Sequence, residues 1–124
     1  MSEQGSRRIL VSDLIVPCEI GVFSHEHGKK QRVRINLSLD IADGGRGIED
    51  KIAATVSYGD IIDQVTAMVE KGRINLVETL AERVASICLA DRRVRSCQVR
   101  IEKLDIYPGA TIVGVEIERF NQRG

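Results

Sequence analysis

The chain has 124 residues, a length typical of one domain, and its 43% hydrophobic and 29% charged residues exclude an intrinsically disordered chain. Its 18 basic and 18 acidic side chains cancel, so no net charge favours nucleic acid or an anionic membrane surface as a partner. Three cysteines without a C-x-x-C spacing argue against a disulfide framework and a zinc site, and they are expected to be buried as small apolar residues. No apolar run has the length of a membrane span or signal peptide. We therefore expect a single cytoplasmic domain over residues 1–124 with a disordered tail over residues 1–6.

Two strands are predicted first. Residues 8–16 are apolar and β-branched up to Pro17, which indicates a strand followed by a connection. From residue 31 to residue 41, polar and apolar side chains alternate without exception, as is typical of a long strand with one buried face. The segment between them is long for a hairpin loop and is expected to be functional. The glycine-rich segment 42–51 lacks the Lys-Ser/Thr ending of a phosphate-binding loop, so it is interpreted as a surface loop.

Two helices are predicted in the middle of the chain. Ser57 is a suitable N-cap for the first, whose apolar residues recur on one face until Gly72, a residue type that commonly follows a helix end. Asn75 is predicted to cap the second helix, which again has one apolar stripe and ends near Asp91.

Period-two alternation returns in residues 97–102 and 113–118, on either side of a Tyr107-Pro108-Gly109 turn. The order strand, strand, helix, helix, strand, strand predicts an α+β fold, with a four-stranded antiparallel sheet and both helices on its apolar face. The opposite face is expected to be polar. The edge strands are long and lack interior proline, so they could pair with another copy, and we expect a homo-oligomer.

Two candidate proton-handling residues stand at the ends of predicted elements. Lys103 is in phase with the apolar residues of the third strand, so its side chain should point toward the helices. It either extends to water or lies partly desolvated in a cleft, where it could transfer protons. Tyr58 follows the Ser57 cap by one residue and could be a core residue or face a pocket.

Two acidic residues are further candidates. Glu78 is the third residue after Asn75, the position of a capping-box glutamate, so its carboxylate either caps the helix or binds a ligand. Glu26 lies between His25 and His27 in a polar loop, where a solvated charge is the simple interpretation. The two histidines lack a partner cysteine or an H-x-x-x-H helix, so no metal site is predicted.

Short motifs spread over residues 8–119 together resemble those of dihydroneopterin aldolases. They are Ile20-Gly21-Val22-Phe23 with Glu26 and Gln31, Thr55-Val56-Ser57-Tyr58, the run from Asn75 to Ala85, and the run from Val99 to Lys103 with that from Val113 to Ile117. Each motif is short, but their joint occurrence at the expected spacing is specific. The resemblance implies the tunnelling fold, ββααββ, whose subunits form barrel rings of four that often stack as octamers, with sites between neighbouring subunits.

The activity implied by this resemblance is the retro-aldol cleavage of dihydroneopterin to 6-hydroxymethyl-dihydropterin and glycolaldehyde in folate biosynthesis. The protein would thus be a carbon–carbon lyase, an aldehyde-lyase. The conjugated C=N of the pterin can accept the electron pair of the broken bond, so no metal, Schiff base or other cofactor is expected.

The resemblance also implies residue roles. Lys103 would deprotonate the side-chain hydroxyl of the substrate, and Tyr58 would lie near the ring and handle a proton. Glu78 would anchor the amino-pyrimidine edge of the pterin. Further substrate contacts are implied for the backbone of Leu76, Val77, Thr55 and Val56, and for Glu26, which would reach the hydroxyl tail from the adjacent subunit.

Leu104 departs from the pattern, because many family members have proline after the lysine. A Lys-Leu pair also occurs in the related dihydroneopterin triphosphate epimerases, so 2′-epimerase or dual activity is the alternative. The basic group of Lys29, Lys30 and Arg32 could meet a triphosphate or could simply be solvated. A third hypothesis is a non-catalytic pterin-binding ring, which would keep the anchor carboxylate but would not need the two proton-handling residues.

Overall fold

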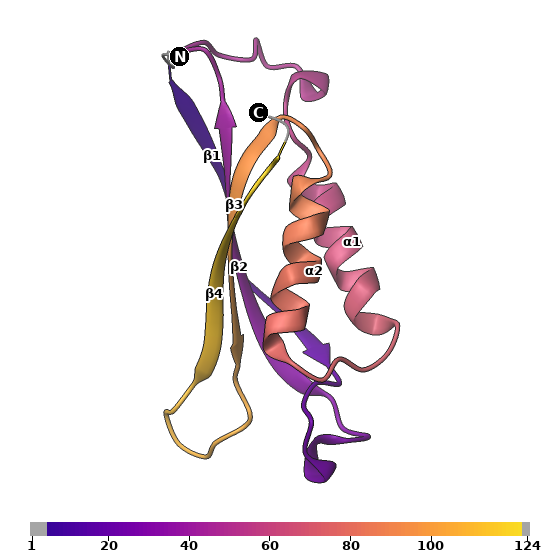
Figure 1. Ribbon diagram of the computed structural model, residues 1–124. Helices are drawn as coiled ribbons and strands as arrows, with labels where there is room; N and C mark the ends of the chain where they lie inside the picture. Colours follow the sequence, from indigo (N-terminus) through magenta and orange to yellow (C-terminus); the bar gives the residue numbers. More distant parts are fainter. Residues whose placement is uncertain (1–4, 123–124) are drawn as a thin grey trace.

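A four-stranded sheet covered on one face by two helices makes up the computed structural model, which describes residues 5–122 (Figure 1). The sheet order is β1-β2-β3-β4, and each neighbouring pair is antiparallel. This arrangement confirms the predicted α+β class, with β1 and β4 as the edge strands. The elements are β1 (Ser6–Cys18), the 3₁₀ turn η1 (Ser24–Glu26), β2 (Gln31–Ala42), the 3₁₀ turn η2 (Ile52–Ala54), α1 (Tyr58–Glu70), α2 (Val77–Leu89), β3 (Val94–Lys103) and β4 (Val113–Phe120).

The core lies between the sheet and the helix layer. Along β2 every second side chain, from Val33 to Ile41, is buried, as the period-two pattern predicts. The helices contribute their apolar stripes, and each fully buried aliphatic side chain contributes roughly 1.5–3 kcal/mol to folding. Apart from β2, the core contains Val65, Leu80, Val84, Val99 and Ile101, and the buried free thiols of Cys18, Cys88 and Cys97.

The N-terminal strand is longer than predicted. β1 continues through Pro17, which is tolerated because β1 is an edge strand and one side of its backbone has no partner strand. Ser6 already pairs with Ala42, so the predicted tail over residues 1–6 is wrong for this residue. Residues 1–4 lie outside the described part of the chain.

The first helix begins as predicted. Ser57 is its N-cap, and the Ser57 Oγ accepts a hydrogen bond from the backbone N–H of Asp60 at 3.1 Å. The second helix ends at Leu89, two residues before the predicted end near Asp91.

The start of the second helix differs from the prediction. Asn75 is not its cap, because the Asn75 side chain accepts a hydrogen bond from the Arg73 guanidinium. Leu76 occupies the N-cap position without any side-chain cap. Glu78 is therefore the second helical residue, and the capping-box interpretation of its carboxylate is wrong.

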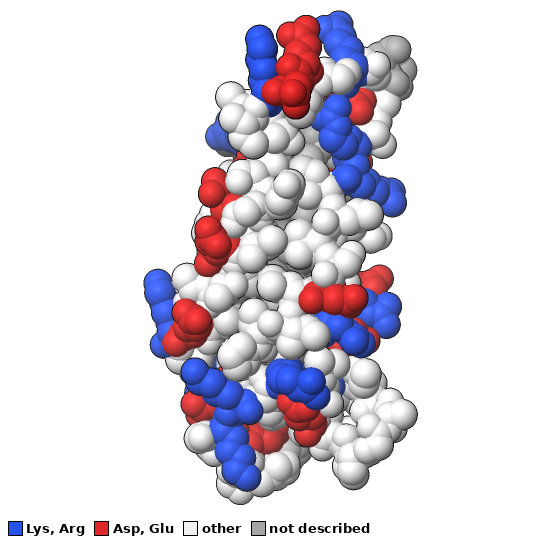
Figure 2. Space-filling model, turned by 180° about the vertical axis from the view of Figure 1, so that it is seen from behind, with Lys and Arg blue, Asp and Glu red and all other residues white. Residues whose placement is uncertain are grey.

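The face of the sheet turned away from the helices is polar, as expected. Arg34 contacts Glu102 at 2.9 Å, and Arg100 bridges Glu102 at 3.3 Å and Glu116 at 3.7 Å. Figure 2 shows the molecule from behind, where charged side chains gather at the two ends and margins around a largely uncharged middle. Within the described residues, neither helix is long and apolar enough to cross a membrane.

Candidate active site

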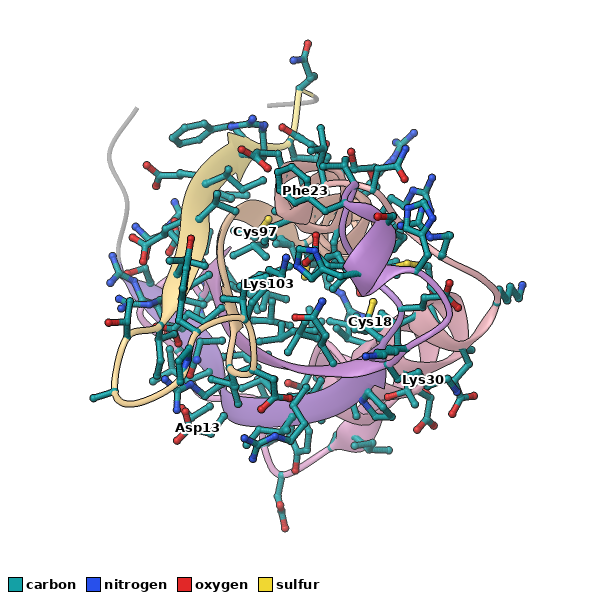
Figure 3. All side chains as sticks on the ribbon, turned by 90° about the horizontal axis from the view of Figure 1, so that it is seen from below. Asp13, Cys18, Phe23, Lys30, Cys97 and Lys103 are labelled. Atoms are coloured by element: carbon teal, nitrogen blue, oxygen red, sulfur yellow. The ribbon has the colours of Figure 1, made fainter. Side chains whose placement is uncertain are left out.

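A buried ion pair lies where β3 ends. The alternation that buries Ile101 turns Lys103 toward the helix side of the sheet, as predicted. Lys103 Nζ lies 2.6 Å from Glu26 Oε2, and the two side chains are 10% and 3% exposed. Seen from this end of the molecule, Lys103 lies in the interior, whereas Asp13 and Lys30 lie at the outer margin (Figure 3). Lys103 is thus desolvated and does not extend to water.

Glu26 is held by its own chain. Its carboxylate accepts hydrogen bonds from Lys103, from Gln31 Nε2 at 3.0 Å and from the backbone N–H of Phe23 at 3.4 Å. These bonds, led by that from Lys103, overcome the effect of burial and lower the pKa of Glu26 to about 2, so the carboxylate is ionised at neutral pH. The interpretation of Glu26 as a solvated charge is therefore wrong. Within one chain, Glu26 contacts Lys103, and its expected reach to the substrate of an adjacent subunit stays a prediction.

The loop that carries Glu26 is tied to the segment before α2. Gly21 N–H donates to the Ile74 carbonyl at 3.0 Å, and the Arg73 guanidinium donates to the Gly21 carbonyl. Gly21 has φ +131°, and a Cβ there would overlap the Glu26 carboxyl group. Only glycine therefore fits between the β1 end and the buried carboxylate.

The first turn of α2 lies at the same end of the molecule as the end of β3, whose last residue is Lys103 (Figure 1). Leu76 is 48% exposed and Glu78 is exposed, and no hydrogen bond or ion pair within residues 5–122 engages the Glu78 carboxylate. Because α2 has no side-chain cap, the backbone N–H groups of Val77 and its neighbours remain available to a ligand. A free carboxylate beside free N–H groups can bind a heterocycle that offers both donors and an acceptor.

The remaining predicted site residues lie at the opposite end. Thr55 and Val56 precede α1, and Tyr58 is its first residue; Val56 is buried, whereas Tyr58 is 61% exposed. Because α1 spans 13 residues, about 20 Å of helix separates Tyr58 from the end that holds Lys103. Thr55 and Val56 line a hollow of about 550 Å³ between α1 and the end of α2. One chain therefore presents the predicted site as two separate halves.

Arg32 and Asp105 form an ion pair that the sequence analysis missed. Arg32 contacts both carboxylate oxygens of Asp105, the shorter distance being 2.7 Å, and this holds the pKa of Asp105 below its usual range. The Arg32 guanidinium is thus shared with Asp105, whereas no ion pair within residues 5–122 engages Lys29 or Lys30, which are both exposed. The backbone N–H of Leu104 donates to the Arg32 carbonyl at 3.0 Å, a bond that proline could not form.

No group of three or more His, Cys, Asp or Glu side chains in the described part of the chain is placed to hold a metal ion. His25 is engaged differently, because its ring stacks on Phe23 with centroids 5.8 Å apart.

Comparisons with known proteins find relatives that match over most of the chain. The family model for FolB, dihydroneopterin aldolase, matches residues 9–118. A dihydroneopterin aldolase of Methylorubrum extorquens is 40% identical over 111 residues, which cover 87% of this chain and 81% of the relative. The dihydroneopterin aldolase of Escherichia coli (strain K12) is 31% identical over 113 residues, covering 91% and 93%.

Solved structures are similar over the same length. The Escherichia coli dihydroneopterin aldolase in complex with neopterin superposes with a TM-score of 0.83 at 30% identity, covering 91% of this chain and 98% of that one. The Burkholderia thailendensis dihydroneopterin aldolase bound to guanine gives a TM-score of 0.79 at 34% identity, covering 93% and 91%.

Proposed function

The chain belongs to the dihydroneopterin aldolase family, and from that premise we propose that Lys103 and its partner Glu26 form the reacting end of its active site. The enzyme is an aldehyde-lyase of folate biosynthesis that splits dihydroneopterin into 6-hydroxymethyl-dihydropterin and glycolaldehyde. The observation that carries the assignment of residues is the 2.6 Å contact between a lysine and a carboxylate that are both shielded from water. We place the enzyme in the cytoplasm, where thiols such as its buried cysteines stay reduced.

The reaction needs a proton to move from a hydroxyl to a carbon. For this step Lys103 must first lose the ammonium proton of its ion pair with Glu26; the amine then accepts, directly or through an ordered water, the proton of the side-chain hydroxyl next to the bond that breaks. The carbon–carbon bond then cleaves, the new carbonyl leaves as glycolaldehyde, and the electron pair moves into the conjugated C=N to form an enamine. The Lys103 ammonium, or Tyr58, returns a proton to the enamine carbon. The pterin itself stores the electrons, so the proposal includes no metal and no Schiff base.

The start of α2 is proposed as the pterin anchor. The exposed carboxylate of Glu78 can accept two hydrogen bonds from the amino-pyrimidine edge. The uncapped backbone at Leu76 and Val77 can donate to the pterin carbonyl. The anchor and Lys103 lie at the same end of one chain, which allows one flat heterocycle to reach both.

A second subunit is proposed to complete the site. Thr55, Val56 and Tyr58 lie about 20 Å from Lys103 within one chain, which is too far for a common pterin. The open edges of β1 and β4 can pair with neighbouring copies, and a ring of four, alone or stacked as an octamer, removes them. In such a ring Tyr58 of one subunit would meet Lys103 of the next.

The assignment is tested by incubating the protein with dihydroneopterin and measuring glycolaldehyde. We expect turnover by the wild type, at least about 100-fold lower kcat for Lys103→Met with pterin binding retained, and lost binding for Glu78→Ala. Lys51→Met, at an exposed surface position, is the control and should match the wild type. Full turnover by Lys103→Met would contradict the assignment.

The same incubation tests the alternative activity. Because Leu104 follows Lys103, as in the related epimerases, 2′-epimerisation, alone or together with cleavage, is the second candidate activity. Epimerisation breaks the same bond and adds glycolaldehyde back to the other face, so the epimer of the substrate would appear among the products. Repeating the reaction with dihydroneopterin triphosphate tests the phosphorylated substrate. Pterin binding without any product would instead indicate a non-catalytic binding ring.

A further inference from the structure

Gln31 is a buried amide beside the ion pair. It is the first residue of β2 and is 9% exposed. Its Nε2 donates to the Ile20 carbonyl at 2.9 Å and to Glu26 Oε2 at 3.0 Å. Both partners are acceptors only, so the amide can take only the orientation that turns its nitrogen toward them. The Ile20 carbonyl thus fixes the donor that Gln31 presents to Glu26.

The Glu26 carboxylate depends on this donor for its orientation. Oε2 receives both Lys103 Nζ and Gln31 Nε2, whereas Oε1 accepts, among residues 5–122, only the long 3.4 Å contact from the Phe23 N–H. Glu26 is the last residue of a three-residue 3₁₀ turn, and its side chain is flexible. Neighbouring residues must therefore hold the Glu26 carboxylate in its orientation. Gln31, on a long paired strand, is the rigid neighbour available for this task.

The amide of Gln31 contributes little net stability to the fold. Gln31 Oε1 is buried and has no hydrogen-bond partner among residues 5–122. An unsatisfied buried acceptor destabilises a protein, which offsets part of the gain from the two bonds of the amide nitrogen. An apolar side chain of similar size would fill the same space without this cost.

We infer that Gln31 is a positioning residue of the proposed reaction, which acts by holding the Glu26 carboxylate against Lys103. The inference rests on the proposed function for its kinetic consequences, but not for the geometry. Gln31 itself touches neither reacting group of the substrate in this role. Its removal should therefore change catalysis through Glu26 alone.

The first test is Gln31→Met, which keeps the size of the side chain and removes the amide. We expect kcat to fall by about 10- to 100-fold, while KM changes by less than about threefold because the pterin is anchored at Glu78. Gln98→Met, on the exposed face of β3, is the matched control and should leave both constants unchanged. Wild-type kcat in Gln31→Met would overturn the inference.

The second test is a double-mutant cycle with Glu26→Gln. If Gln31 acts through Glu26, adding Gln31→Met to Glu26→Gln should lower kcat by less than about twofold further, because the group being positioned is already absent. An equal fold loss in both backgrounds would mean that Gln31 acts independently of Glu26, and the inference would be rejected.

A third measurement does not depend on turnover. The carboxyl carbon of Glu26 can be assigned in NMR spectra from its disappearance in Glu26→Gln and then followed against pH. The charged groups around it are Lys103 of β3 and, lining a shared cavity of about 190 Å³, His25, Lys29 and Asp105. Because the Gln31 hydrogen bond lowers the pKa of Glu26, Gln31→Met should move the midpoint to higher pH. An unchanged midpoint overturns the inference, whereas absent glycolaldehyde from the wild type overturns only the proposed function.

Discussion

At the scale of single residues, the site depends on two charges that are each costly to bury alone. Glu26 and Lys103 have nearly no contact with water, and removing one partner of such a pair leaves an unpaired charge, at a cost of roughly 3–5 kcal/mol. Glu26→Gln should therefore destabilise the protein at neutral pH even though the shape of the side chain is kept.

This destabilisation should depend on pH. The pKa of Glu26 is lowered from 4.5 to about 2 in the folded protein, so its carboxylate contributes stability above about pH 4.5 and loses it as the pH falls toward 2. We expect the difference in the free energy of unfolding between wild type and Glu26→Gln to shrink over this range. Chemical denaturation at several pH values measures it. A difference that stays constant would show that the ion pair does not contribute as described.

Gly21 provides a second test at this scale. Gly21→Ala adds a Cβ that meets the Glu26 carboxyl group, whereas Gly28→Ala, also at a positive φ of 77°, meets nothing within 4 Å. Gly28→Ala should cost only the backbone strain of about 1–2 kcal/mol. We expect Gly21→Ala to lower Tm further than Gly28→Ala and also to reduce turnover. Equal Tm values for the two variants would argue against the close approach of Gly21 to the carboxylate.

At the scale of elements, the two helices begin in different ways. The Ser57 side chain caps α1, so at the end of α1 that bears Tyr58 the backbone N–H of Asp60 is already hydrogen-bonded. α2 has no side-chain cap, so its first N–H groups stay open beside Glu78. Asn75, which precedes the N-cap residue Leu76, accepts a hydrogen bond from Arg73 instead. A helix start that lacks a cap is thus available for binding.

The α1 cap can be tested directly. Ser57→Ala removes the acceptor of the Asp60 N–H and should lower the free energy of unfolding by about 1 kcal/mol. Ser86→Ala, at an exposed interior position of α2, should be neutral or slightly stabilising because alanine favours helices. Urea denaturation of both variants makes the comparison, and equal effects would contradict the role of Ser57.

At the scale of the whole molecule, the proposed site divides between the two ends of one long sheet-and-helix body. The end of β3 and the start of α2, which carry Lys103 and Glu78, lie at one end, and the start of α1, which carries Tyr58, lies at the other (Figure 1). A contact between unlike ends of two copies repeats around a ring, and each such contact would assemble one complete site.

Subunit mixing tests this arrangement. Lys103→Met and Tyr58→Phe should each be nearly inactive alone. After the two variants are unfolded, mixed in equal amounts and refolded together, activity should rise to about a quarter of the wild type. The reason is that half of the subunits supply the intact lysine and half of their neighbours supply the intact tyrosine. Mixtures that stay inactive, although mass measurement shows hybrid oligomers, would mean that the site lies within one chain.

Part of the site could be read from the sequence because side-chain direction is a local property. The period-two pattern of β3 predicted that Lys103 points to the helix side, and Ser57 was recognised as a cap from its neighbours. For Gln31 the sequence offers only membership of a motif and predicts no role. The residues next to Gln31 in the sequence do not indicate that its amide will contact Glu26.

The element order, the buried face of each element and the antiparallel sheet could be predicted from local patterns, since periods of 2 and 3.6 residues fix which side chains share a face. The pairing of Glu26 with Lys103, 77 residues away, and the position of Tyr58 at the far end from both emerge only in the folded molecule. The same holds for the hydrogen bond between Asn75 and Arg73 and for the uncapped start of α2. Such contacts depend on how elements pack in space, and packing is a property of the whole chain that no short window of residues contains.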